Sequence, residues 1–159
     1  MTPIWEIQST AVALLVASAD LVTLAESAIL ADDGSYPKTP GREDALAGVG
    51  ACIVVSVIGE PPPEVIDESL DGYARNINPI TVWVDVRRTD TLGQESIQAE
   101  AAKMISIVQA TLLGKPIADL DDRFVFKQPN PPYQPWGKFG ADLRYGVLFF
   151  VESIIEPAS

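Results

Sequence analysis

The residues that most often carry out chemistry in proteins are scarce in this sequence. It contains no histidine and a single cysteine, Cys52. Histidine is the commonest general base and metal ligand, and it is the usual partner of a serine or cysteine nucleophile. One cysteine forms neither an intramolecular disulfide nor a thiolate zinc cluster, and Cys52 lies in an apolar stretch, where an inert core thiol is expected. The composition therefore predicts a non-enzymatic protein without a catalytic residue, cofactor or metal, in a reducing compartment.

Carboxylates are the remaining candidates, and they gather in two places. Asp119, Asp121 and Asp122 offer the oxygen ligands that Ca²⁺ and Mg²⁺ prefer, but the segment lacks the glycine and distal glutamate of an EF-hand loop, which favours a solvated turn. Acid–base catalysis in the second group would require burial to shift a pKa, whereas a solvated charge run is the ordinary interpretation on a proline-rich loop. This second group consists of Glu60, Glu64, Asp67, Glu68 and Asp71.

Charge is distributed unevenly along the 159 residues, whose net charge is −11. Residues 1–74 hold 12 acidic and 2 basic residues, whereas residues 75–159 hold 10 acidic and 9 basic residues. An acidic half argues against specific binding of nucleic acid, whose phosphates require lysine and arginine. It remains compatible with a protein that works close to DNA and must avoid adhering to it.

The most informative stretch runs from residue 80 to residue 113. It begins with an alternating strand, continues through a polar bend at residues 88–93, and ends in an amphipathic helix of about five turns. The helix can cover the apolar face of the strand, which is formed by Ile80, Val82, Val84 and Val86. Trp83, Asp85 and Arg87 fall on the other face. Either this face contacts another subunit or partner, as aromatic residues and arginine often do, or Trp83 packs under a loop of its own chain.

The other elements follow from local signals. We expect an N-terminal helix from Thr2, interrupted at residues 18–20 and followed by a short helical piece at residues 21–30. Residues 11–19 resemble the apolar region of a signal peptide, but no basic residue precedes them, so a core helix is predicted; the run is too short to span a bilayer. Strands are expected at residues 52–58, 123–127 and 144–154, and long loops at about 32–47, 59–78 and 128–140.

These elements predict a single α+β domain over residues 1–159. Its sheet should be mixed or antiparallel with roughly four strands, and the N-terminal helix and the long helix should pack on one face. The last strand is apolar on both faces, so both should be covered, one by helices and the other by a second subunit. Leu148 and Phe150 lie on that outer face, and Tyr133 and Trp136 lie in the aromatic loop. This loop is either a lid over its own sheet or a docking surface.

The layout resembles the tail terminator (tail-completion, or minor tail) proteins of long-tailed bacteriophages and phage-like particles. The similarity rests on the order of the elements and on three segments: the strand ITVWVDVRRTD, the helix SIQAEAAKMISIVQATLLG and the last strand RYGVLFFVESI. It extends from Thr2 to Glu152. The loops at residues 32–47 and 59–78 are longer than a compact member of the family would have.

The resemblance implies a virion structural protein of the tail or neck, assembled in the host cytoplasm, with no membrane partner. Such proteins form a hexameric ring that caps the tail tube, stops its polymerisation and joins the tail to the head connector. DNA passes through the ring without being specifically bound. On this reading Trp83, Asp85, Arg87, Tyr133, Trp136, Leu148 and Phe150 are predicted to contact subunits or partners. Glu60, Glu64, Asp67, Glu68 and Asp71 are predicted to line the channel.

Other functions compete with this one. A head-closure or connector ring of the neck would bind portal and not tail-tube ends. A small acidic adaptor, or an enzyme, belongs to a different class; the absence of histidine and of a phosphate-binding loop counts against an enzyme.

Overall fold

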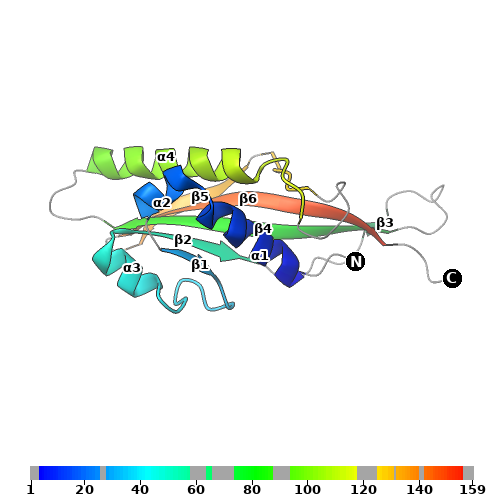
Figure 1. Cartoon of the computed structure of the whole chain (residues 1–159), viewed down its shortest axis with the longest axis horizontal. Coiled ribbons are helices and arrows are strands. Elements are labelled where there is room, and N and C mark those ends of the chain that lie inside the picture. Colours follow the sequence, from blue (N-terminus) through cyan, green and yellow to red (C-terminus); the bar gives the residue numbers. More distant parts are fainter. Residues whose placement is uncertain are drawn as a thin grey trace.

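The computed structural model consists of a sheet between two unequal helical layers (Figure 1). It describes residues 4–25, 28–57, 64–65, 74–87, 94–117, 125–130, 132–139 and 142–155. The described helices are α1 (Ile4–Val16), α2 (Ala19–Ala25), α3 (Arg42–Gly48) and α4 (Gln94–Leu112). The α+β class, the mixed sheet and the N-terminal helix are confirmed.

The sheet is built around two long antiparallel strands. These are β4 (Ala74–Arg87) and β6 (Asp142–Ile155), which pair along their whole lengths. The strand order is β1–β2–β4–β6–β5, and the short β3 also pairs with β4. The sheet is mixed because β1 runs parallel to β2 whereas the other pairs are antiparallel. The remaining strands are β1 (Ile29–Ala31), β2 (Ala51–Ser56), β3 (Glu64–Val65) and β5 (Tyr133–Phe139).

One face of the sheet, here called the first face, carries the main core. Alternation in β4 directs Ile80, Val82, Val84 and Val86 to this face, and all four are buried. They pack with apolar residues of α1, α2 and α4, which confirms the predicted cover by the N-terminal and long helices. The opposite face, here called the second face, carries Trp83, Asp85 and Arg87.

A smaller layer lies on the second face. It consists of α3 and the segment before it, and Leu46 packs there against Cys52 and Val54 of β2. In Figure 1, α3 and α4 lie on opposite sides of the sheet. We call residues 32–50 the α3 segment, because its loop and helix together contact this face.

Several boundaries differ from the predictions. Within the described residues the sheet includes six strands. β2, β4 and β6 correspond to expected strands, whereas β1, β3 and β5 are additional, and β1 and β3 are too short to leave a sequence pattern. Residues 29–31 form β1 and do not continue the helix predicted to residue 30. α3 begins at Arg42, inside the predicted loop 32–47, and β4 begins at Ala74, inside the predicted loop 59–78.

The C-terminal third also differs. Residues 133–139, predicted as loop, form β5. Within the expected strand 123–127, residues 123 and 124 lie outside the described residues, and Val125 and Lys127 form isolated bridges to Pro116 and Phe150. β5 is an edge strand, and Pro135 lies within a register shift between Gln134 and Gly137, a place where a sheet tolerates proline.

Among the described residues, no single helix is long and apolar enough to cross a bilayer. The pair Glu6–Val16 and Ala19–Ala25, bent by 85°, passes a test of length and composition alone.

Candidate functional site

Trp83 lies on the second face, near the C-terminal end of β4, and is covered by its own chain. Its ring stacks on Tyr36 of the α3 segment, with centroids 4.7 Å apart and planes at 13°. Beneath it lies Gly146 of β6, the residue that pairs with Trp83 across the strands. A Cβ atom at position 146 would lie 3.1 Å from Trp83 Cζ3, so glycine is what allows the indole to lie flat against the sheet.

Asp85 lies fully buried beside this stack. The Arg42 guanidinium donates from Nε to Asp85 Oδ2 at 2.7 Å, and the Tyr36 hydroxyl donates to Asp85 Oδ1 at 2.8 Å. Arg42 itself is buried, and its Nη2 also donates to Asp142 Oδ2 at 3.1 Å. A single guanidinium of α3 therefore holds one carboxylate on β4 and one on β6.

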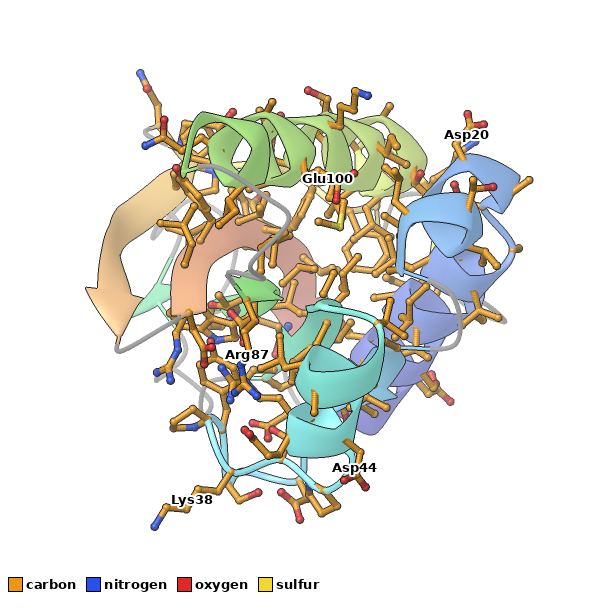
Figure 2. The ribbon with its side chains drawn as sticks, turned by 90° about the vertical axis from the view of Figure 1, so that its left-hand side faces the viewer. Asp20, Lys38, Asp44, Arg87 and Glu100 are labelled. Atoms are coloured by element: carbon orange, nitrogen blue, oxygen red, sulfur yellow. The ribbon has the colours of Figure 1, made fainter. Side chains whose placement is uncertain are left out.

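The network continues to the surface through Arg87. Its Nε donates to Asp142 Oδ1 at 2.9 Å, and its two terminal nitrogens donate to the Glu43 carboxylate at 2.7 and 2.8 Å. Figure 2 shows Arg87 beside α3. Arg144 adds a third guanidinium, 3.7 Å from Asp142 and 6.0 Å from the Tyr36 ring centroid. We call this end of the second face the clamped end.

Asp32 shapes the loop that carries Tyr36. One of its carboxylate oxygens accepts hydrogen bonds from the Tyr36 backbone N–H and the Thr39 hydroxyl, and the other accepts one from the Ser56 hydroxyl of β2. These bonds tie the loop to the sheet. They fix Tyr36 where it meets both Trp83 and Asp85.

Burial and hydrogen bonding shift the pKa values of Asp85, Asp142 and Tyr36 in different directions. Burial raises the pKa of Asp85, and the hydrogen bonds from Arg42 and Tyr36 oppose that rise without cancelling it. Burial also acts to raise the pKa of Asp142, but hydrogen bonds from Arg87 and Arg42 outweigh it, so the pKa of Asp142 is lowered. Burial and the Asp85 charge raise the pKa of Tyr36. Each carboxylate thus engages an arginine, an arrangement suited to holding two layers together.

Two further observations bear on chemistry. Burial raises the pKa of the Cys52 thiol to about 12, which leaves it protonated at neutral pH and a poor nucleophile. Within the part of the chain that the structure describes, no three His, Cys, Asp or Glu side chains are placed to hold a metal ion. Residues 119–122, predicted as a solvated turn, lie outside that part.

The other end of the second face has a different character. There Pro79, Leu148 and Phe150 are half-buried and line a shallow hollow together with Pro129 and Glu152. We call this the open end. It lies on the same two strands as the clamped end, several residues away from α3.

The predicted contact residues are therefore divided between these surroundings. Trp83, Asp85 and Arg87 lie at the clamped end. Leu148 and Phe150 lie at the open end. Asp85 is 0% exposed in the single chain, so a direct contact with another subunit is not open to it. Tyr133 is 42% exposed on β5, and its hydroxyl donates to Gln109 of α4. Trp136 belongs to β5 by its backbone, and its side chain lies outside the described part.

Of the five predicted channel residues, the structure describes the backbone of Glu64. Glu64 pairs with Arg75 between β3 and β4, whereas Glu60, Asp67, Glu68 and Asp71 lie outside the described residues. Their role remains a prediction.

Sequence reasoning missed the α3 segment as the cover of Trp83. Tyr36, Arg42 and Asp142 are far apart in the chain, and no spacing links them. One signal was available: Arg42 is one of two basic residues among the first 74, which hold 12 acidic residues. A lone arginine in such a segment is a candidate partner for a buried carboxylate.

Comparison with known proteins gives limited guidance. No family model matches the sequence, and no curated protein matches it. A similar solved structure is a chain of the "Virion of native gene transfer agent (GTA) particle", with 21% identity, coverage of 92% of both chains and a TM-score of 0.48. Similarity at this level does not transfer a role to this chain.

Proposed function

We propose that this protein is a non-enzymatic structural component of a phage or phage-like virion. In this proposal it forms a six-membered ring that caps the tail tube and joins it to the head connector. The observation that carries the proposal is the open end of the second face, an apolar surface on the two central strands. Two of its residues, Leu148 and Phe150, are among the contacts predicted from the sequence.

The order of elements supports the same function. The tail terminator resemblance rests on a strand followed by a long helix and then a final strand pair. In the fold the first two are β4 and α4, and the last strand is β6, which pairs with β5 and not with a strand at residues 123–127. The clamped end supports a structural role too, because its arginine–carboxylate network fixes a layer in place.

Charge is consistent with a channel for DNA. Six copies at −11 each carry −66 formal charges, and a ring of that sign repels the phosphate backbone and does not bind it. The acidic residues predicted for the channel are Glu60, Glu64, Asp67, Glu68 and Asp71. Changing Glu64, Asp67, Glu68 and Asp71 to lysine should slow or jam DNA passage, and unchanged infectivity would refute this part.

The decisive experiment is negative-stain electron microscopy of the purified protein, alone and mixed with tail tubes from the particle that encodes it. Six-fold rings, or caps at one end of each tube, are the expected result. Bare tubes together with binding to portal would instead indicate a connector ring. Bare tubes and no portal binding would indicate an adaptor.

A further inference from the structure

The hollow at the open end has the properties of a protein-docking surface. It holds about 290 Å³, at the lower limit of small-molecule pockets, which also require converging polar groups. Its lining is apolar except for Glu152. Two prolines and one aromatic ring give it a rigid shape, and rigid apolar surfaces suit a protruding apolar group of another protein.

A protruding apolar surface occurs elsewhere on the same chain. Val16, the last residue of α1, is 52% exposed, and Val22 in the first turn of α2 is 36% exposed. The two helices meet at 85°, and the exposed residues Ala13, Ala17 and Ala19 lie around the bend. We call this the α1–α2 corner. It accounts for two of the four large hydrophobic residues exposed in the described part of the chain.

The corner and the hollow lie on different sides of the molecule. α1 and α2 pack on the first face, near β1 and β2. The hollow lies on the second face, over β4 and β6, toward the β5 edge. Figure 2 shows α2, with Asp20, at one flank and β5 at the opposite flank. When two different patches on opposite flanks of one chain bind each other, neighbouring copies contact head to tail. Such a contact produces a closed ring when a whole number of the rotations that relate neighbouring copies adds up to a full turn.

We propose that the hollow at Pro79, Leu148 and Phe150 receives the α1–α2 corner of a second copy of this chain. This inference rests on the proposed ring and names the two surfaces that build it. Val16 and Val22 enter the hollow, so that apolar area on both copies is removed from water.

Charge favours this pairing over others. Two copies of a chain with a net charge of −11 repel one another wherever acidic surfaces meet. The hollow is nearly neutral, because the Lys127 ammonium lies 3.8 Å from Glu152. Among its described residues the corner carries one exposed charge, Asp20. Lys127 lies beside the hollow, not in its lining, and is the residue of opposite sign there. By contrast, the exposed side of α3 presents Glu43 and Asp44.

A mixing experiment tests the contact. One variant carries Val16→Glu and Val22→Glu, which alters the corner and leaves the hollow intact. The other carries Leu148→Gln, which alters the hollow and leaves the corner intact. Each variant alone should remain monomeric by native mass spectrometry, whereas an equimolar mixture should form one-to-one dimers. Leu113→Glu, which changes an exposed residue outside both patches, should self-associate like the wild type.

In the proposed contact, Asp20 of one copy lies close to Lys127 of the next. Both residues are exposed, so exchanging their charges tests the contact without disturbing the core. Asp20→Lys alone, or Lys127→Asp alone, should weaken self-association roughly two- to fivefold, as expected for an exposed pair. The combined variant should recover wild-type association. Circular dichroism and urea midpoints verify that every variant folds.

The outcomes separate this inference from the proposed function. A monomeric wild type at every accessible concentration, a mixture without dimers, or a combined variant without recovery would overturn the corner-and-hollow contact. If the wild type then still caps tail tubes, the function stands and the ring uses other surfaces. If the mixture forms dimers but the wild type leaves tubes bare, the contact stands and the function is wrong.

Discussion

The second face of the β4–β6 pair differs sharply between its two ends. At the clamped end, the α3 segment covers Trp83 and Asp85, and three arginines and three carboxylates form a continuous network. At the open end, Leu148 and Phe150 remain half-buried beside a hollow. The same two strands thus carry a polar surface that the α3 segment covers and an apolar surface that the described residues leave half-exposed.

The difference shows which surface is available to a partner. Buried ion pairs contribute little net free energy, because desolvation offsets the attraction, but removing one partner is costly. The clamped end therefore fixes one position of the α3 segment and resists its displacement. The ion pairs of the network do not extend to the open end. A second chain could therefore bury the apolar surface there without breaking any of them.

Removing the central cation should have the largest effect. Arg42→Met leaves Asp85 buried beside an apolar group, and should lower the free energy of unfolding by about 3–5 kcal/mol. The measurement is the urea midpoint. Lys38→Met, which removes the other basic residue of the first 74, an exposed one, should change it by less than about 0.5 kcal/mol. Equal effects of the two substitutions would mean that the network does not hold the α3 segment.

Asp142 should produce a pH-dependent effect of intermediate size. Asp142→Asn should cost about 2 kcal/mol at neutral pH, because it removes charged hydrogen bonds to Arg42 and Arg87. The pKa of Asp142 is lowered in the folded chain, so its contribution is complete above the ordinary value of 3.8 and is lost as the pH falls below it. The stability difference between wild type and variant, from urea midpoints, should therefore shrink below pH 3.8.

Asp85 provides the contrasting titration. Because its pKa is raised, the folded chain takes up this proton more readily than the unfolded chain. The stability of the wild type relative to Asp85→Asn should therefore rise as the pH falls toward 3.8. The same sign for both carboxylates would contradict their opposite shifts.

Gly146 tests how closely the clamped end is packed. In Gly146→Ala the new Cβ would lie 3.1 Å from the Trp83 ring, which Tyr36 holds from the other side. Overpacking of this kind should cost about 1 kcal/mol, measured by thermal unfolding. Gly48→Ala is the matched control, because nothing lies within 4 Å of its added Cβ, and alanine is favoured in a helix. A neutral Gly146→Ala would show that Trp83 can move away.

Periodicity explains why part of the fold could be predicted. The alternation of β4 and the helical stripe of α4 exist because each element buries one face, so a single segment reveals them. Leu148 and Phe150 could be identified in the same way, since they give β6 a second apolar face. The sequence thus predicts the structure where the hydrophobic pattern of a single element shows which of its faces is buried.

The cover of the clamped end could not be predicted in this way. Arg42 and Asp85 are 43 residues apart, and Arg42 and Asp142 are 100 apart. Such contacts leave no periodic pattern, and α3 has only seven residues. β5 could not be predicted because Pro135 and its aromatic neighbours favour a loop. A strand that contains proline is tolerated at the edge of a sheet, which is where β5 lies.

The smallest effect on stability is expected at the open end, where adjacent residues of β6 offer a matched pair. Val147 is fully buried on the first face, and Val147→Ser should cost about 3 kcal/mol through lost packing and a buried hydroxyl. Leu148 is half-buried on the second face, so Leu148→Ser should cost less than about 1 kcal/mol in urea unfolding. Its larger consequence should be weaker self-association in native mass spectrometry. If Leu148→Ser destabilised the monomer as much as Val147→Ser, the chain itself would cover the open end, leaving no surface there for a second copy.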